Sequence, residues 1–371
     1  MENTNKSYFF HTDQLTVGYE GKPLIREINI QLNKGEILTL IGPNGAGKST
    51  ILKSITRQLA TISGTVYLEQ QQMARMSNKE VSRKLAVVLT ERMRPELMTC
   101  EDVAGTGRYP YTGRMGILSA QDRKKVREAL ELVHANDLAG RYFTEVSDGQ
   151  KQRVLLARAV CQEPEAIVLD EPTSFLDIRH KLELLTILKD LVHRKRVAVL
   201  MSLHELDLAQ KISDYIVCVN GNSIERCGTP EEIFTSAYIT RLYGITKGSY
   251  QAELGCLEME PAQGPPRVFV IGGNGSGIPV YRRLQRRGIP FAAGVLHEND
   301  IDYPVAKALA SRLIAERAFE PIGEEAFARA AEVLKACGRV ICCPDHFGAM
   351  NEKNRILAEL GADRLCGPED I

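Results

Sequence analysis

A glycine-rich segment that ends in a lysine and two hydroxyl residues is the part of the sequence best suited to phosphate chemistry. It fits the pattern G-x-x-x-x-G-K-[ST] and comprises Gly42, Pro43, Asn44, Gly45, Ala46, Gly47, Lys48, Ser49 and Thr50. Glycines allow successive backbone N–H groups to turn toward one anion, and the start of a following helix adds positive potential. Lys48 can reach the outer phosphates of a nucleotide, and the Ser49 hydroxyl can bind Mg²⁺. A glycine turn with an incidental lysine is the alternative interpretation.

Two adjacent carboxylates, Asp170 and Glu171, follow an apolar run at residues 166–169. A carboxylate at the tip of a strand can hold Mg²⁺, directly or through water. The carboxylate one residue further on can orient and deprotonate an attacking water. A strand that ends in Asp-Glu carries little information alone, but beside the glycine-rich segment it indicates hydrolysis of a nucleoside triphosphate.

The elements around these residues follow the order strand, tight loop and helix that a phosphate-binding unit requires. An apolar run bounded by glycines at residues 36–42 predicts a buried strand, and helical spacing follows at residues 50–59. Further strands are expected at residues 9–17, 28–32, 85–89, 166–169 and 197–201, and helices around residues 122–133, 150–161 and 181–193. Alternating strands and helices predict an α/β domain with a largely parallel core sheet.

Length and composition set the class of protein. At about 150 residues per domain, 371 residues predict two domains. The 47 basic and 47 acidic residues give a formal net charge of +0, which argues against a dedicated nucleic-acid binder. No signal peptide and no apolar run of membrane-spanning length is recognisable, so we expect a cytoplasmic chain. The nine cysteines are expected to be reduced, and the group Cys337, Cys342 and Cys343 lacks zinc-site spacing.

The chain divides into two predicted domains. A composition shift after residue 245 and the run Glu260-Pro-Ala-Gln-Gly-Pro-Pro266 indicate a loop and linker. We expect a nucleotide-binding domain at residues 1–250, a linker at 251–266 and a smaller Rossmann-like α/β domain at 267–371. In the second domain, apolar runs and helical spacing begin again after the linker.

The second domain offers weaker functional signals. The segment from Gly272 to Gly277 follows a predicted strand and suggests anion or nucleotide binding, although it does not satisfy G-x-G-x-x-G. One helical face carries four arginines, Arg282, Arg283, Arg286 and Arg287. Such a face binds a phosphate or a partner in one interpretation and is a solvated surface in the other. Residues 297–300 follow the next strand, at the edge where such sheets bind ligands. We hypothesise a regulatory or ligand-binding role, with a plain dimer contact as the alternative.

The motifs and their order resemble those of the ATP-binding cassette (ABC) ATPases, over roughly residues 8–245. Residues 146–150, which include Ser147, Gly149 and Gln150, are similar to the family signature at a helix start. Residues 174–177 resemble the D-loop, His204 resembles the switch histidine, and Tyr19 lies where the family places an adenine-stacking aromatic. The resemblance implies a P-loop NTPase fold of the ABC type, with ATP and Mg²⁺ as its cofactors.

The resemblance also implies a mechanism. Two copies of the chain would face head to tail with two ATP molecules between them, so that Ser147 and Gly149 of one copy meet the phosphate loop of the other. A helix start that donates to a γ-phosphate across the interface makes closure depend on intact ATP. Glu171 would act as the general base, His204 would contact the γ-phosphate, and Asp170 and Ser49 would hold Mg²⁺.

Two positions depart from the family pattern. Thr90-Glu91 stands where a Q-loop glutamine is usual, so Glu91 is assigned there as a further Mg²⁺ ligand. Asp148 stands in the signature where glycine is commoner. Its negative charge beside a triphosphate would slow turnover unless the side chain points away or is neutralised.

The kind of ABC protein follows from what lies between the motifs. About a hundred residues separate Lys48 from Ser147 without sustained heptads, unlike the DNA-repair type, and one set of motifs is present, unlike the two-cassette ribosomal type. Residues 107–113 (Gly-Arg-Tyr-Pro-Tyr-Thr-Gly) resemble the branch that serves importers of iron-siderophore complexes, haem and cobalamin, and Arg108 with its aromatic neighbours suits a protein contact.

This branch implies the partners of the chain. They are transmembrane permease subunits, a second copy of the chain and, indirectly, a substrate-binding protein, at the cytoplasmic face of the membrane, with no nucleic acid. A soluble ABC ATPase without a permease, or a transporter for another substrate, is the alternative.

Overall fold

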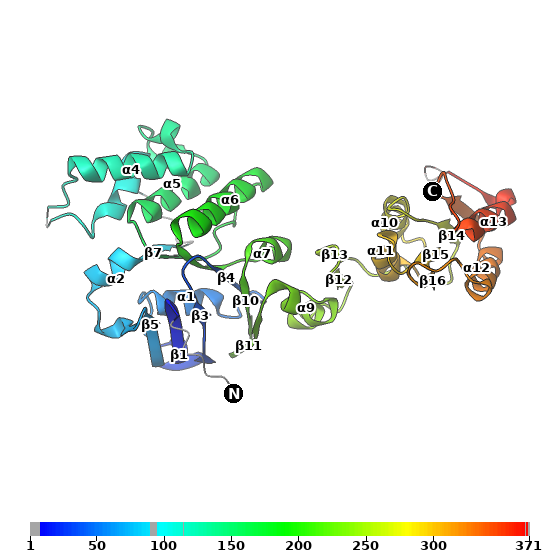
Figure 1. The fold of residues 1–371 in the computed structure, drawn as a ribbon, viewed down its shortest axis with the longest axis horizontal. Helices are drawn as coiled ribbons and strands as arrows, with labels where there is room; N and C mark the ends of the chain where they lie inside the picture. The colour runs from blue at the N-terminus through cyan, green and yellow to red at the C-terminus, as the bar shows by residue number, and fades with distance from the viewer. Residues whose placement is uncertain (1–7, 90–94, 114, 368, 370–371) are drawn as a thin grey trace. The chain divides into compact units, whose positions relative to one another are not determined.

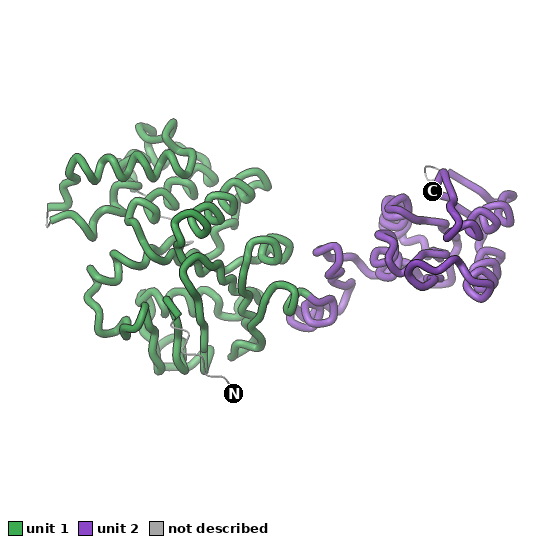
Figure 2. The backbone as a smooth tube through the Cα atoms, viewed as in Figure 1, with its two compact units in different colours: residues 1–234 green, residues 235–371 purple. Residues whose placement is uncertain are grey.

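The computed structural model describes residues 8–89, 95–113, 115–367 and 369. The chain forms two compact units, unit 1 at Met1–Phe234 and unit 2 at Thr235–Ile371, coloured separately in Figure 2. This division lies earlier in the chain than the boundary that composition indicates. In addition, a short hairpin of β12 (Ser249–Gln251) and β13 (Cys256–Glu258) occupies part of the expected linker. Within the described ranges, no helix has the length and apolar character needed to cross a membrane.

Unit 1 is built on one mixed sheet (Figure 1). Among the described residues the sheet has 11 strands in the order β6-β5-β1-β2-β11-β10-β4-β9-β8-β7, with β3 paired to β1. The five strands from β10 to β7 pair in parallel, as predicted for the core. The pairs that link β1, β2, β3, β5 and β6 are antiparallel, and β11 joins the two parts by pairing in parallel with β2 and antiparallel with β10. The strand bounds are β1 (Phe10–Tyr19), β2 (Lys22–Ile28), β3 (Gln31–Leu32), β4 (Ile37–Ile41), β5 (Ser63–Leu68), β6 (Gln71–Gln72), β7 (Leu85–Val88), β8 (Ala166–Leu169), β9 (Ala198–Ser202), β10 (Tyr215–Asn220) and β11 (Ser223–Gly228).

The helices of unit 1 begin with side chains that satisfy free backbone N–H groups. Reciprocal capping boxes start α2, α3, α4, α5 and α8, and Asp177 caps α6. The bounds are α1 (Lys48–Ile55), α2 (Asn78–Lys84), α3 (Cys100–Gly105), α4 (Ala120–Leu132), α5 (Asp148–Cys161), α6 (Ile178–Lys195), α7 (Leu206–Ile212) and α8 (Pro230–Ile233). These local signals fix where each helix starts, and therefore where the loops between strands and helices lie.

The core of unit 1 fixes the start of α1. Ile51 and Ile55 of this helix are fully buried in one cluster with Leu15 of β1 and Leu40 of β4. Helix α1 therefore packs between the antiparallel strands and the parallel core. Because β4 and α1 are both held by this core, the loop that joins them has a fixed position and shape.

Unit 2 contains a smaller parallel sheet of order β16-β15-β14-β17. Its strands are β14 (Val268–Ile271), β15 (Phe291–His297), β16 (Arg312–Glu316) and β17 (Arg339–Cys342). Its helices are α9 (Ser236–Leu242), α10 (Ile278–Arg286), α11 (Asp302–Leu309), α12 (Glu324–Ala336) and α13 (Glu352–Leu360). One core joins the sheet to α10 and α11, and another joins it to α12 and α13, so helices cover both faces. This is the doubly wound α/β arrangement predicted for the second domain.

Candidate active site

The glycine-rich segment forms a tight loop between β4 and α1. Gly42 has φ +147, and a Cβ atom there would lie 2.1 Å from the carbonyl oxygen of Val219. Gly47 has φ +96, and a Cβ atom there would lie 2.5 Å from the Ile25 side chain. Only glycine fits these two positions. The spacing of glycines in the sequence thus reflects backbone geometry at a loop that leads directly into a helix start.

Lys48 is held at the mouth of this loop. Its side chain is buried, and its Nζ donates to the carbonyl oxygens of Gly42 at 2.7 Å and Pro43 at 3.1 Å. Burial lowers the pKa of Lys48, and the nearby carboxylates of Glu171 and Asp170 oppose that shift. The side chain is therefore a pre-positioned cation whose burial is best compensated by an anion such as a phosphate.

Three oxygen-bearing side chains meet at the carboxyl ends of the parallel strands. The Ser49 hydroxyl donates to Asp170 Oδ1 at 3.0 Å, and the buried Ser202 hydroxyl donates to the same oxygen at 2.7 Å. Hydroxyl and carboxylate oxygens are the ligands that Mg²⁺ prefers. The donor set of Ser49 and Asp170 thus fits a magnesium ion.

Glu171 lies next to this oxygen set and has a constrained backbone. Its φ is +48, and its backbone N–H donates to Ser202 Oγ at 2.9 Å. The Glu171 carboxylate contacts His204 Nε2 through Oε1 at 2.5 Å and accepts from Ser174 Oγ through Oε2 at 3.1 Å. Both groups are part-buried, so the carboxylate is oriented yet reachable by a water. This is the geometry that a general base requires.

Tyr19 and the D-loop complete the candidate site within one chain. The Tyr19 side chain is 52% exposed at the end of β1, and its hydroxyl lies 3.1 Å from Thr50 Oγ1. The ring is thus tied to the start of α1 and leaves a face open for a base. Thr173, next to the D-loop, donates to Glu205, which also pairs with Lys181. This network fixes the segment between Glu171 and α6.

The signature residues begin α5, where Ser147 is exposed, Gln150 is half-buried and Gly149 is buried. Ser147 and Gln150 form the capping box of this helix, with Gln150 N donating to Ser147 Oγ at 3.3 Å and Ser147 N donating to Gln150 Oε1 at 3.0 Å. A Cβ atom on Gly149 would lie 2.9 Å from the His180 ring, whose Nδ1 is 2.8 Å from Asp177. Sequence reasoning missed His180, which links the signature to the D-loop. Glu91, assigned as a Q-loop ligand, lies outside the described residues.

Arg108 has a different role from the one its motif suggests. The prediction of a protein contact was wrong for this side chain, because it is only 5% exposed. Arg108 pairs with Asp122 at 3.0 Å and Glu163 at 2.9 Å, donates to the carbonyl of Cys161, and lies over the Tyr111 ring. A guanidinium with this many fixed partners holds the segment around residues 107–113 to α4 and the end of α5.

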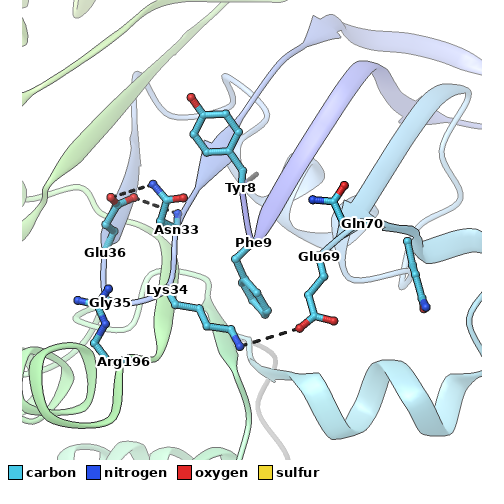
Figure 3. Close-up of a pocket in the computed structure, with 10 residues that line it drawn as sticks. Tyr8, Phe9, Asn33, Lys34, Gly35, Glu36, Glu69, Gln70 and Arg196 are labelled. Carbon is cyan, nitrogen blue, oxygen red and sulfur yellow. Dashed lines mark hydrogen bonds and ion pairs between the residues drawn. The ribbon is translucent and has the colours of Figure 1, made fainter. Parts of the chain in front are cut away.

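A separate cleft of about 820 Å³ lies elsewhere in unit 1 (Figure 3). Lys34 reaches toward Glu69 across it, and Glu36 accepts two hydrogen bonds from Asn33. Gly35 and Glu36 precede β4, whereas the glycine-rich loop follows the same strand. The cleft therefore lies at the start of β4, at the opposite end of this strand from the glycine-rich loop, and is not part of the candidate nucleotide site.

The glycine-rich segment of unit 2 binds a carboxylate of the chain itself. Asp302, fully buried, accepts from the N–H groups of Gly273 at 2.6 Å, Gly277 at 2.9 Å and Ile278 at 3.2 Å. Burial raises the pKa of Asp302, against the effect of these donors.

Of the predicted arginine face, Arg282 pairs with Glu258. In the part of the chain that the structure describes, no group of His, Cys, Asp and Glu side chains is arranged to hold a metal.

Two family models match the chain: that of the ABC transporter at residues 25–174, and that of the MJ0874 family at residues 291–365. An uncharacterized ABC transporter ATP-binding protein, MJ0873 of Methanocaldococcus jannaschii, is 39% identical, over 77% of this chain and 99% of its own. The iron(3+)-hydroxamate import ATP-binding protein FhuC of Bacillus subtilis is 35% identical, over 63% and 87%. The cobalamin import ATP-binding protein BtuD of Halobacterium salinarum is 30% identical, over 89% and 84%.

A solved structure agrees with these relatives. An inward-facing putative metal-chelate type ABC transporter matches with 28% identity and a TM-score of 0.57, over 63% of this chain and 88% of its own. A P-loop α/β fold with an oriented carboxylate beside a lysine and an oxygen set defines an ATP-hydrolysing cassette. The chain belongs to the family of ABC transporter ATP-binding proteins.

Proposed function

We propose that this chain is the ATPase subunit of an importer for a metal-bound organic complex, with a corrinoid as the favoured cargo. One observation carries the proposal: Lys48, the Ser49–Asp170 oxygen pair and the Glu171–His204 pair lie together at the carboxyl ends of the parallel strands. Each group has the chemistry that phosphoryl transfer to water needs, and all are placed by buried strands and helix starts.

In the proposed reaction, the glycine loop and Lys48 bind the β- and γ-phosphates of ATP, and Tyr19 stacks on the adenine. Glu171 takes a proton from a water whose oxygen attacks the γ-phosphorus, while the bond from that phosphorus to the β–γ bridging oxygen breaks to release ADP and phosphate. His204 holds Glu171 in position. Ser49 and Asp170, with Glu91, would hold Mg²⁺, which supplies positive charge to the phosphates when bound.

The signature residues supply the second half of the site in this proposal. Ser147, Gly149 and Gln150 lie at the start of α5, where Ser147 is exposed and pairs with Gln150 in the capping box of the helix. In a head-to-tail pair they would donate to the γ-phosphate held by the other copy. Closure would then depend on intact ATP, and hydrolysis would release it.

An exposed apolar surface supports a permease as the partner. Tyr109, Met115 and Ile117 are between 59% and 85% exposed around the segment in which Arg108 is anchored. Gly116 brings part of this surface together, because a Cβ atom there would lie 3.6 Å from the Tyr109 ring. Exposed aromatic and aliphatic groups on a fixed segment suit a cytoplasmic helix of a permease, which supports a location at the cytoplasmic face of the membrane.

The choice of cargo rests on the relatives. Their names give iron(3+)-hydroxamate import for FhuC and cobalamin import for BtuD, both metal-bound organic complexes. The match to BtuD covers 89% of the chain and therefore extends into unit 2, whereas the match to FhuC covers 63%. A shared second unit favours the corrinoid over the siderophore.

Capture of a trapped complex tests the proposal. The Glu171→Gln protein, incubated with Mg-ATP, should hydrolyse about 10²-fold or more slowly than wild type and retain a multi-span permease from detergent-solubilised membranes of its own cell. Lys48→Ala, which should not bind ATP, is the matched control. In vesicles that hold the captured permease, ATP-dependent uptake of cyanocobalamin should exceed that of a ferric hydroxamate.

Two results would overturn the proposal in different ways. Retention of ribosomal or DNA-repair proteins without any membrane protein would assign the chain to the soluble ABC ATPases. Retention of a permease that imports only the ferric hydroxamate would support the importer function and contradict the corrinoid cargo.

A further inference from the structure

Unit 2 contains a cavity at the edge of its sheet where doubly wound folds bind ligands. The cavity has a volume of about 530 Å³, within the range of small-molecule sites. It lies beyond the carboxyl ends of β14 and β15, between the loops that follow them and the loop after β16. Its lining residues are Asn274, His297, Asn299, Asp300, Ile301, Phe319 and Met350.

The phosphate position beside this cavity is already filled. Asp302 accepts three backbone N–H groups at the start of α10, where the phosphate of a dinucleotide would otherwise bind. Asp300 accepts a further loop N–H, from Asn274 at 3.0 Å. A ligand phosphate would have to displace one carboxylate and approach another, so the loop selects against phosphorylated ligands.

The remaining lining has the groups that a nucleoside needs. Asp300 accepts from the N–H groups of Asn274 and Asp302, and a carboxylate has about four acceptor sites, so it can also accept from the hydroxyls of a ribose. An acidic side chain beyond the second strand binds ribose in this way in doubly wound folds. Phe319 is 81% exposed with φ +63, and with Ile301 and Met350 it offers an apolar wall for a flat base.

A second cavity of about 730 Å³ adjoins the first, sharing Asn299, Asp300 and Ile301. Its other charged lining residues are Glu253, Glu298 and Lys307. With Asp300, the three carboxylates outnumber the one ammonium. The adjoining space therefore favours a neutral or positively charged substituent over an anionic one.

We propose that unit 2 binds a nucleoside, or a nucleoside derivative, that carries no phosphate on its 5′ carbon. Asp300 accepts hydrogen bonds from the ribose, Phe319 stacks on the base, and the adjoining cavity takes a neutral or cationic 5′ substituent. This site does not depend on the transport function proposed for the whole chain.

Equilibrium dialysis with radiolabelled adenosine tests the proposal on the full chain. The Glu171→Gln protein is kept in saturating Mg-ATP so that the nucleotide site of unit 1 is occupied. One adenosine should bind per chain, and unlabelled 5′-AMP should compete at least about 10-fold more weakly than adenosine. Asp300→Asn and Phe319→Ala, made in the same background, should each weaken binding about 10-fold, whereas Glu359→Gln on exposed α13 should not.

Phe319→Ala keeps the test decisive if Asp300→Asn disturbs the loop, because the Phe319 side chain is largely exposed and its loss should not unfold the unit. The proposal fails if no adenosine is retained under saturating Mg-ATP. It also fails if 5′-AMP competes as well as adenosine, since the loop would then accept a phosphate. Equal loss of binding in Glu359→Gln and Phe319→Ala would likewise overturn it.

Discussion

Replacing Ser202 by alanine should slow ATP hydrolysis without weakening ATP binding. The Ser202 hydroxyl joins two parts of the site: it donates to Asp170 Oδ1 at 2.7 Å and accepts from the Glu171 N–H at 2.9 Å. It is fully buried at the end of β9, so no water replaces it. The alanine variant would leave the N–H of Glu171, at φ +48, without its partner and would remove one of the two serine hydroxyls that donate to Asp170 Oδ1.

The magnitude follows from these two hydrogen bonds. A hydrogen bond to a charged group contributes about 1.5–3 kcal/mol, and tenfold in rate corresponds to about 1.4 kcal/mol. If about half of that energy holds Glu171 and Asp170 in the reactive arrangement, kcat should fall roughly 10-fold. The dissociation constant for Mg-ATP should change less than about 3-fold, because the Lys48 contacts with the glycine loop are untouched.

Steady-state hydrolysis and equilibrium binding of Mg-ATP measure the two effects separately. Thr39→Val is a matched control, since Thr39 is also fully buried in the sheet and its hydroxyl pairs at 2.6 Å with that of Ser213, rather than with Asp170 or Glu171. Thr39→Val should lower the free energy of unfolding but leave kcat almost unchanged. The reasoning is refuted if Ser202→Ala keeps kcat within 2-fold of wild type, or if Thr39→Val lowers kcat as much.

Three further predictions concern packing and protonation. Arg108→Ala removes the guanidinium that pairs with the buried Asp122 and leaves that carboxylate only its hydrogen bonds from Ser119, so the free energy of unfolding of unit 1 should fall by about 3 kcal/mol in a urea titration. Asp302→Ala leaves three N–H groups without their acceptor, at about 1–3 kcal/mol each, and should speed hydrogen exchange at residues 273–278; unchanged exchange would contradict the bonds. Burial raises the pKa of Cys161 to about 12, so iodoacetamide at pH 8 should modify it only after unfolding in urea.

The meeting of the glycine loop with Asp170 and Glu171 was largely predictable because its signals are local. The glycine loop, Lys48 and the Asp170–Glu171 pair each lie beside a strand or helix that periodicity reveals, and parallel strands bring their carboxyl ends to one edge. The antiparallel layer was only partly predictable: β2, β5, β6 and β11 were not anticipated, and neither was β10 in the parallel core. In β5 and β11 most side chains are exposed or half-buried, so neither gives a continuous apolar run.

Contacts between distant segments could not be predicted. Ser202 and His180 read as ordinary strand and helix residues, and their roles arise only where β9 meets β8 and where α6 meets α5. Asp302 is similar, because nothing in the run from Gly272 to Gly277 indicates that a carboxylate of the same chain fills the loop. For Arg108, the family motif predicted a protein contact. Whether an arginine forms an ion pair or a surface contact depends on its burial, and burial is a property of the tertiary structure.

Asp148 is the departure from the signature whose effect can now be bounded. Its side chain is 56% exposed and pairs with Lys151 at 3.4 Å, one turn along α5. Exposed pairs of this kind are worth about 0–1 kcal/mol, and an acidic residue in the first helical turn also stabilises the helix start. The Asp148 carboxylate should therefore lower the rate of ATP hydrolysis by at most about 5-fold.

Asp148→Asn should accordingly raise hydrolysis modestly, and Lys151→Met should lower it by exposing the uncompensated carboxylate to the phosphates of the other copy. Both effects are electrostatic, so they should vanish in 1 M salt, where the screening length is about 3 Å. Steady-state rates of the two variants at low and high salt measure this. A rise of more than about 10-fold in Asp148→Asn, or one that persists in high salt, would mean that Asp148 acts by blocking the γ-phosphate contact rather than by its charge.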